Sequence, residues 1–318
     1  MTDTSLKIDY IGIDISKHTL EVALHANSKT ICYDNTLNGI EKLLSKINTF
    51  KNPLIIIEPT GGYETLLEQM CIDAKTAIRS ILANRIRDFA KASGQLAKND
   101  RIDAKMILLY GKTFNLTAND ACFQRKNPEL KALMKRRAQI TKIMAQEKNH
   151  LENTYHQAIK EEIKEHISYL EVRIKRIEKE ILSLINLDDE LKEKYEYLTS
   201  IKGVGNVMSM LCLSALPELG HISNKQITAL VGVVPYVKNS GQYQGQARIY
   251  GGRADIRKML YMASMSAIAH NLPIKKYYEH LRANGKPFKV AMVACMRKLL
   301  IMMNCVCKEK RSWQEVYF

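Results

Sequence analysis

The sequence predicts an α/β domain followed by a mostly helical remainder, and three observations support this fold class. Residues 7–83 alternate β-branched, apolar runs of strand length with amphipathic helical stretches. Residues 129–198 contain neither proline nor glycine and are rich in Glu, Lys, Leu and Ile, a composition typical of long helices. Glycine-rich segments reappear further on, between apolar helical stretches. We therefore expect three parts, at residues 1–120, 121–198 and 199–318.

The first part is expected to build a mixed sheet. Three antiparallel strands come first, because the segments KIDYIGIDIS, LEVALHA and KTICYDN follow one another at hairpin distance. Helices at residues 39–50 and 63–74 then alternate with strands at residues 53–59 and 77–83. The resulting order, β-β-β-α-β-α-β-α with acids at strand ends, is the plan of the ribonuclease-H-like fold.

The middle part predicts a coiled-coil connector of two long helices with a break near residues 153–157. Its second helix carries apolar residues at alternating four and three spacing, which is a heptad seam. We interpret this seam as a rigid spacer or as the contact of a homo-oligomer, dimer or tetramer, and keep a nucleic-acid contact along its basic flank as the alternative. The segment LKEKYEYLTS at residues 191–200 fits either a helix or a hinge. The seam residues are Ile163, Ile167, Leu170, Ile174, Ile177, Ile181 and Leu184.

The third part contains two glycine-rich segments, each followed by an apolar helix. Residues 201–216 pair a glycine turn with a helix, and such a turn can present backbone N–H groups to a phosphate. Residues 231–265 combine glycine with cations and lead into a helix that begins near Ala254. A closing helix at residues 285–303 is expected to be mostly buried, with a basic edge.

The charge balance points to a polyanionic partner. Lys and Arg number 48 against 33 Asp and Glu, which gives a net charge of +15 and a pI near 9.4. Nucleic acid is the leading candidate, since such a surplus is typical of proteins that bind it. The apolar runs fall short of the roughly 20 residues that cross a bilayer, and the chain opens on no signal peptide. We therefore expect a cytoplasmic protein without a membrane partner.

The cysteines and histidines predict neither disulfides nor a zinc site. The seven cysteines are odd in number, scattered and mostly set among apolar neighbours, as reduced core thiols are. Cys305 and Cys307 have the wrong spacing for a zinc knuckle, and no histidine lies near a second pair of ligands.

Four acidic residues stand out by position. Asp14 ends the first strand, Glu58 ends the fourth, and the pair Asp100 and Asp103 opens a predicted helix inside a basic segment. Strand ends of a mixed sheet open onto one crevice, and residues three apart on a helix share a face, so all four can converge. Clustered carboxylates repel one another unless a hard divalent cation joins them. An all-oxygen site of this kind, with one or two ions, suits Mg²⁺ best.

Each acid also has an ordinary explanation. Asp14 fits the first phosphate-loop acid of a sugar-kinase or actin-like fold, although no second glycine-rich phosphate loop of the expected kind follows. Glu58 could simply end a strand, and Asp100 could cap a helix. The order Asp, Glu, Asp, Asp on matching elements favours the joint site over these single explanations.

Several segments resemble the signature segments of the DEDD transposases of the insertion-sequence family IS110, more closely its IS1111 branch. They are YIGIDISK, IIIEPTGGYE and RDFAKASGQLAKNDRIDAKM in the first part. GVVPYVKNSG, YGGRADIRKMLYMA and GKPFKVAMVACMRKLL are similar to that family's second conserved domain. The match covers nearly the whole chain, in order. The pilin-gene DNA invertases are related and share the same acids.

The resemblance implies a RuvC-like N-terminal domain, a coiled-coil connector and a transposase domain that supplies a serine nucleophile. It assigns metal binding and catalysis to Asp14, Glu58, Asp100 and Asp103, and the nucleophile to Ser240 of the NSG motif. It also implies DNA recombination within an insertion sequence, guided by a structured noncoding RNA that pairs with donor and target DNA.

Cations surround Ser240 in the sequence. They matter because a serine hydroxyl is a poor nucleophile unless it is activated and the phosphate charge is neutralised. Arginines can clamp phosphates in bidentate fashion. Without the resemblance, this loop could simply bind RNA or DNA, and Ser240 could be a turn serine. The residues expected to bind nucleic acid are Lys238, Arg248, Arg253, Arg257 and Lys258.

We expect Ser240 to cut one DNA strand, forming a phosphoserine and freeing a hydroxyl end, with Mg²⁺ assisting and religation following. Since Ser240 and the acids lie in different parts of the chain, we also expect a site that is shared between protomers. Three alternatives stay open: a Mg-dependent RuvC-like nuclease or junction resolvase that uses water, a site-specific DNA invertase, and a nucleic-acid-binding protein with a decayed nuclease fold. The strand chemistry is common to a transposase and an invertase.

Overall fold

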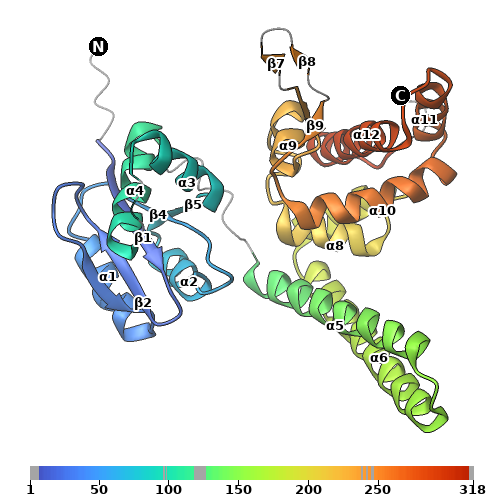
Figure 1. Ribbon diagram of the computed structural model, residues 1–318, viewed down its shortest axis with the longest axis horizontal. Helices are drawn as coiled ribbons and strands as arrows, with labels where there is room; N and C mark the ends of the chain where they lie inside the picture. Colours follow the sequence, from blue (N-terminus) through green and yellow to red (C-terminus); the bar gives the residue numbers. More distant parts are fainter. Residues whose placement is uncertain are drawn as a thin grey trace. The chain divides into compact units, whose positions relative to one another are not determined.

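The fold is described from a computed structural model of the 318-residue chain. The structure describes residues 7–95, 97, 99–117, 127–237, 239–240, 243–244 and 247–314. The chain divides into two compact units, Met1–Gln124 and Arg125–Phe318, and each is described by itself (Figure 1).

The first unit is built on a five-stranded mixed sheet with the strand order β3-β2-β1-β4-β5. β1, β2 and β3 are antiparallel neighbours, whereas β4 pairs parallel with β1, and β5 parallel with β4. The predicted order of strands and helices is found as far as β5, but two helices follow β5 where the sequence predicted one, and each strand is shorter than its apolar segment. The strands are β1 (Asp9–Ile15), β2 (Thr19–Ala23), β3 (Ile31–Asp34), β4 (Pro53–Ile57) and β5 (Ala77–Ser80).

Helices cover both faces of this sheet. α1 (Leu37–Ile47) and α2 (Thr65–Asp73) pack on one face, and α3 (Ala83–Ala92) and α4 (Asp100–Thr113) on the other. Successive side chains of a strand point to opposite faces. In β1, Ile11, Ile13 and Ile15 accordingly join the core under α1 and α2, whereas Tyr10 and Gly12 face α4.

α4 packs very close to the sheet because glycines leave room for it. A Cβ atom on Gly111 of α4 would stand 1.9 Å from the Cδ1 atom of Ile56 in β4. Gly12 of β1 faces the same helix from the sheet side. Interiors are packed as densely as organic crystals, so these two glycines set the distance between α4 and the sheet.

The second unit begins with a long antiparallel hairpin of α5 (Pro128–Asn153) and α6 (Gln157–Asn186) (Figure 1). The break between them lies where the sequence predicts it. The seam of α6 packs against α5 of the same chain, so it already has a partner within the protomer. Within the predicted seam, Ile167 and Leu184 are only half-buried, and Ile185, beside Leu184, is fully buried. The buried residues of the hairpin are Leu130, Met134, Ile140, Ile163, Leu170, Ile174, Ile177, Ile181 and Ile185.

Six further helices complete the second unit. The segment LKEKYEYLTS is helical, within α7 and its C-cap. Among the described residues, α12 is the one helix long and apolar enough to cross a membrane, and 61% of its most apolar window is buried inside the protein. That burial is typical of a core helix. The helices are α7 (Asp189–Thr199), α8 (Asn206–Ala215), α9 (Asn224–Val231), α10 (Ala254–His270), α11 (Leu272–Ala283) and α12 (Phe288–Glu309).

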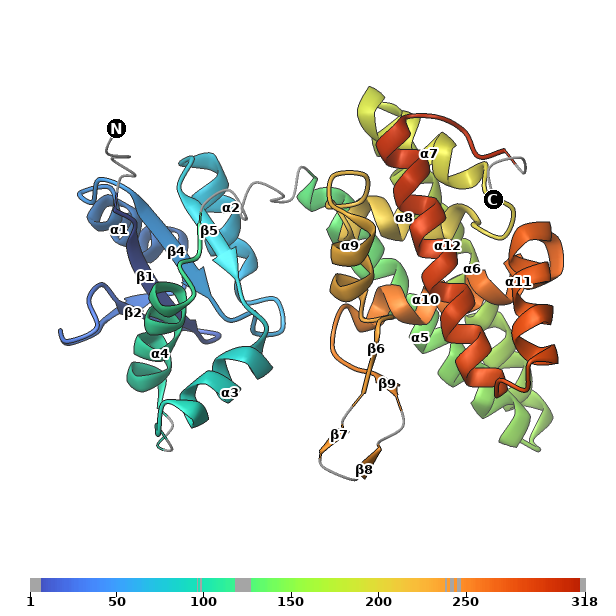
Figure 2. The ribbon, with the colours of Figure 1, turned by 90° about the horizontal axis from the view of Figure 1, so that it is seen from above.

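A narrow β-ribbon separates α9 from α10 and extends away from the helices (Figure 2). β6 (Pro235–Tyr236) pairs antiparallel with β9 (Arg248–Ile249), and β7 (Asn239–Ser240) pairs antiparallel with β8 (Tyr243–Gln244). The sequence indicated a glycine- and cation-rich segment here but no strands, because each strand is only two residues long.

Candidate active site

The strand register brings Asp14 and Glu58 to the same end of the sheet. Ile13 of β1 is paired with Ile57 of β4, so Asp14 and Glu58 each follow one residue later on neighbouring parallel strands. Gly12 faces α4, and Asp14, two residues on, points to the same face. Both acids are half-buried.

The first turn of α4 carries the other two acids, Asp100 and Asp103. The helix is capped by Asn99, whose side chain accepts a hydrogen bond from the backbone N–H of Ile102 at 2.9 Å. Asp100 is therefore the first helical residue and not the cap. Acidic groups in a first helical turn interact favourably with the helix dipole, which reduces the cost of placing two of them there.

The charges of the other three acids act on Asp14. Burial, followed by the charges of Asp103, Asp100 and Glu58, raises the pKa of Asp14 to about 6, against a smaller lowering by a hydrogen bond from the backbone of Ile15. Carboxylates raise the pKa of one another when they share a site, and the strand register independently places Asp14 beside Glu58. The acids predicted from the sequence are therefore neighbours in the first unit.

These neighbours offer the oxygen donors that Mg²⁺ prefers. As they stand, however, no group of three or more His, Cys, Asp or Glu side chains among the described residues is arranged to hold an ion. The acids fit a hard cation by the chemistry of their donor atoms.

Two charged residues that the sequence reading missed border these acids. Glu21 of β2 is the register partner of Asp14, so both side chains emerge on the α4 face. Its carboxylate accepts a short hydrogen bond from the hydroxyl of Thr30 and lies 3.7 Å from the Nε atom of Arg101. The alternation within the β1–β2 hairpin is the signal that would have identified Glu21. Arg101, between Asp100 and Asp103, is largely exposed.

The loop after β4 is held by a buried acid, Glu64, which the sequence reading also missed. Its carboxylate accepts hydrogen bonds from the backbone N–H groups of Thr60 at 3.1 Å and Gly62 at 2.9 Å. The hydroxyl of Thr60 in turn donates to the carbonyl oxygen of Glu58 at 3.1 Å. Glu64 is only 7% exposed, so this loop has a fixed shape that sets the position of Glu58.

Asn35 joins the ends of β1 and β4. Its Nδ2 atom donates to the carbonyl oxygen of Ser16 at 3.0 Å and to that of Tyr63 at 3.1 Å. The residue that follows β1 is thereby linked to the loop that carries Glu58.

The predicted nucleophile lies in the second unit. Ser240 is paired with Tyr243 at the far end of the ribbon (Figure 2). Its backbone is described, whereas its side chain and the whole of Lys238 lie outside the described residues. Arg248 on β9 and Lys258 on α10 are exposed.

The remaining two predicted cations, Arg253 and Arg257, make internal bonds. Arg253 forms a bidentate ion pair with Glu218, with nitrogen–oxygen distances of 2.7 and 2.5 Å. The Nη1 atom of Arg257 donates to the carbonyl oxygens of Val231 and Gly251. The expectation that both guanidiniums clamp phosphates stays a prediction, and the structure gives each of them other partners.

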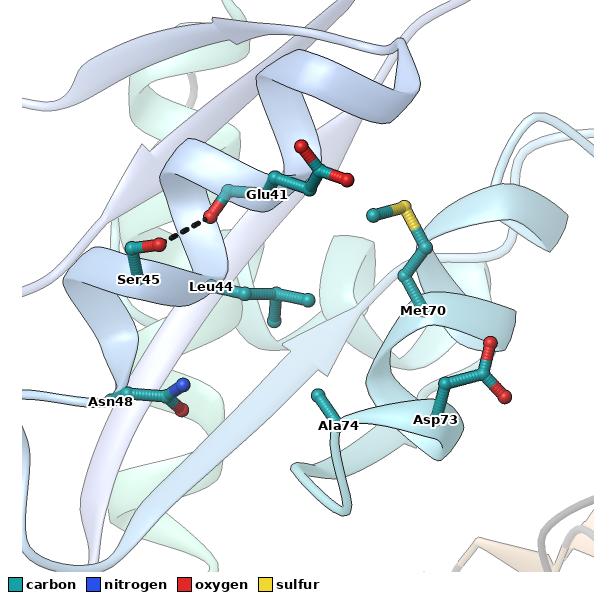
Figure 3. Close-up of a pocket in the computed structure, with 7 residues that line it drawn as sticks. All are labelled: Glu41, Leu44, Ser45, Asn48, Met70, Asp73 and Ala74. Atoms are coloured by element: carbon teal, nitrogen blue, oxygen red, sulfur yellow. Dashed lines mark hydrogen bonds between the residues drawn. The ribbon is translucent and has the colours of Figure 1, made fainter.

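A pocket in the first unit lies away from these acids. It opens between α1 and α2, on the sheet face opposite α4 (Figure 3). It includes none of the predicted site residues, and a Ser45 hydroxyl that donates to the carbonyl oxygen of Glu41 at 2.9 Å is an ordinary helical contact. The lining residues are Glu41, Leu44, Ser45, Asn48, Met70, Asp73 and Ala74.

Known proteins match this chain over both units. A DEDD transposase model of the IS110 type matches residues 11–159, and a model described as transposase, IS116/IS110/IS902 family, matches residues 195–279. The pilin gene-inverting protein of Moraxella bovis is 26% identical over 321 residues, which cover 96% of this chain and 98% of that protein. The pilin gene-inverting protein of Moraxella lacunata is 25% identical over the same extent. The first model spans the four acids, and the second spans Ser240.

Proposed function

Because this chain belongs to the IS110 family of transposases and is a DNA transposase or recombinase, we propose that it cuts and rejoins DNA through Ser240. A divalent cation held by four acids assists this reaction. The observation that supports this proposal most strongly is the convergence of charge on Asp14, whose pKa is raised by burial and then by Asp103, Asp100 and Glu58. The strand order β3-β2-β1-β4-β5, with α4 across its face, supports a RuvC-like domain.

In this proposal the residues that hold the cation are Asp14, Glu58, Asp100 and Asp103, and Mg²⁺ suits them because every donor is a carboxylate oxygen. A bound divalent ion stabilises the charge that develops on a phosphate under attack. Asp14 must lose its proton to serve as a ligand, and this happens as the pH rises through about 6.

The hydroxyl of Ser240 supplies the attacking oxygen. A new bond forms between the serine oxygen and phosphorus, and one bond between phosphorus and a strand oxygen breaks. The serine proton passes to a base, and the leaving oxygen takes up a proton and becomes the free hydroxyl end. Religation reverses these steps on a new strand, so no external energy source is needed.

DNA, donor and target, is the proposed substrate, and a structured noncoding RNA is the proposed guide. The net charge of +15 supports two polyanionic partners. Lys238, Arg248 and Lys258 are the cations that we propose to contact nucleic acid near Ser240. We further propose a cytoplasmic homo-oligomer whose copies share acids and serine. Sequencing the RNA that copurifies with the protein, and testing it for complementarity to DNA, checks the guide.

Trapping a covalent protein–DNA adduct tests the serine chemistry. The wild-type chain should form a Mg²⁺-dependent adduct, Ser240→Ala should form none, and Asp103→Asn should reduce it by at least about 100-fold. Ser183→Ala, at an exposed serine of α6, is the matched control and should behave as the wild type. Cleavage without any adduct would indicate water attack, as in a junction resolvase, and an adduct that persists in Ser240→Ala would refute the assignment.

A DNA invertase is the second candidate, and the two pilin gene-inverting relatives favour it. Both candidates use the same strand chemistry, so the products separate them. A plasmid that carries a segment between inverted sites reports inversion, whereas a donor element with a separate target reports insertion.

A further inference from the structure

We propose that Arg253 and Arg257 are positioning residues that fix the base of the ribbon, and thereby the approach of Ser240, instead of binding phosphate. The proposal rests on the proposed function of Ser240. We define the ribbon base as Gly232, Gly251 and Gly252 together with these two arginines, all of which are described residues of the second unit.

Arg257 joins the two ends of the ribbon. Its Nη1 atom donates to the carbonyl oxygen of Val231, the last residue of α9, at 3.1 Å. The same nitrogen donates to the carbonyl oxygen of Gly251, where the chain returns toward α10, at 2.5 Å. One guanidinium therefore holds together the residues at which the ribbon leaves and re-enters the helical core.

Arg253 joins the chain that follows β9 to α9 and to the end of α8. Its backbone N–H donates to the carbonyl oxygen of Leu230 at 3.1 Å. Its guanidinium donates to the carbonyl oxygen of Ala215, at the end of α8, at 2.8 Å and pairs with both carboxylate oxygens of Glu218. The side chains of Arg253 and Glu218 are 33% and 15% exposed, so this bidentate pair is partly shielded from water.

Glycines allow the backbones at the two ends of the ribbon to lie in direct contact. A Cβ on Gly232 would stand 2.3 Å from the carbonyl oxygen of Gly251, and one on Gly252 would stand 2.4 Å from the backbone nitrogen of Gly232. Both residues have positive φ, +79° and +71°, which glycine adopts readily. The backbones of the two ends thus lie in direct contact, and the β6–β9 pairs follow immediately.

The ribbon base explains how a narrow two-stranded element can carry a reactive residue. An isolated hairpin is only marginally stable, so its far end would sample many positions. Two ends that are locked together by arginine, carboxylate and glycine contacts restrict that freedom. A displacement of about 1 Å at a reacting group can cost on the order of 100-fold in rate.

Two measurements on the full chain separate positioning from phosphate binding: the salt dependence of DNA affinity, and the rate of adduct formation at saturating DNA. Each phosphate contact that is lost lowers the salt slope by about one. We expect Arg257→Gln to leave the salt slope unchanged, because this guanidinium contacts no phosphate, and to slow adduct formation by roughly tenfold or more, because the shorter glutamine cannot hold both carbonyl oxygens. Glu218→Gln should slow adduct formation as well, because it weakens the ion pair that holds Arg253. Lys225→Ala, at an exposed lysine of α9, is the control that removes one positive charge away from the ribbon base.

Glu218→Gln is the sharper variant, because it leaves every arginine charge in place. The double variant Glu218→Arg with Arg253→Glu should recover part of the rate that either single change loses. Hydrogen exchange at residues 230–253 reports the ribbon base without any reaction and should become faster in Arg257→Gln. Unchanged exchange and adduct rates in both variants, or a lower salt slope with an unchanged rate, would overturn the proposal. A wild-type protein that cleaves without an adduct would refute only the serine chemistry. Hydrogen exchange would still test whether Arg253 and Arg257 fix the ribbon base.

Discussion

Gly12 of β1 lies directly against Ala104 of α4: a Cβ atom on Gly12 would stand 2.2 Å from the carbonyl oxygen of Ala104. Ala104 follows Asp103 and Gly12 precedes Asp14 by two residues, so this contact lies beside the acids. The absence of one side chain therefore allows the first turn of α4 to reach Asp14.

The first prediction concerns this contact. Gly12→Ala should lower the free energy of unfolding of the first unit by about 1–3 kcal/mol, because the added methyl group meets backbone atoms that cannot move aside. It should also lower DNA cleavage, since α4 carries Asp100 and Asp103. Urea denaturation, followed by a probe in the first unit, measures the change. Lys112→Ala, at an exposed position late in α4, is the control and should stay within about 0.5 kcal/mol of the wild type. An unchanged stability in Gly12→Ala would mean that α4 does not pack this closely.

The second prediction concerns pH. The folded state raises the pKa of Asp14 from 3.8 to about 6, chiefly by burial and then by the charges of Asp103, Asp100 and Glu58. Because the folded state disfavours the ionised carboxylate, the free energy of unfolding is highest below pH 3.8, where Asp14 is protonated in both states. It falls as the pH rises through about 6, where Asp14 ionises in the folded state. Asp14→Asn removes the charge, so the variant should be more stable than the wild type at about pH 7.5 in EDTA and equal to it near pH 4.

Added Mg²⁺ should reverse that order. Ligand carboxylates bind metal in the ionised form, so Mg²⁺ should stabilise the wild type more at about pH 7.5 than at about pH 5. It should have little effect on Asp14→Asn. A wild-type protein that is more stable than Asp14→Asn at the higher pH in EDTA would show that Asp14 carries no such penalty.

The third prediction concerns Glu64. Glu64→Ala leaves the backbone N–H groups of Thr60 and Gly62 without their acceptor, so the first unit should lose roughly 2 kcal/mol or more and cleavage should fall with the displacement of Glu58. Glu64→Gln keeps an accepting oxygen and should retain most of the stability and most of the cleavage activity. Thermal unfolding and DNA cleavage rates compare the alanine and glutamine variants. Glu41→Ala, at an exposed position of α1, is the control. Equal losses in the alanine and glutamine variants would contradict the role given to the accepting oxygen.

The fourth prediction concerns the helical hairpin. Ile185→Ala should cost about 2–5 kcal/mol in the unfolding of the second unit, because this side chain is fully buried between α6 and its neighbours. Leu184→Ala, at the neighbouring half-buried position, should cost clearly less. A larger loss of stability in Leu184→Ala than in Ile185→Ala would support Leu184 as the seam residue that the heptad spacing predicts.

Local patterns predicted the elements of the first unit because apolar alternation and helical periodicity are short-range signals. Asp14, Glu58, Asp100 and Asp103 could be identified because each lies at the end or start of such an element. Glu64 could not, since its role depends on a loop whose backbone N–H groups turn inward. Arg253 and Arg257 were expected to bind nucleic acid, and the sequence could not show the carbonyl and carboxylate partners that the structure gives them.

Calorimetric titration of the full chain with Mg²⁺ tests the shared cation site, for the wild type and for Asp14→Asn, Glu58→Gln and Asp103→Asn. We expect the wild type to bind one or two ions and each variant to lose at least about tenfold in affinity, because the ion is shared among all the acids. Glu41→Gln should bind as the wild type does. Equal Mg²⁺ affinity in the wild type and all three acid variants would contradict a shared cation site.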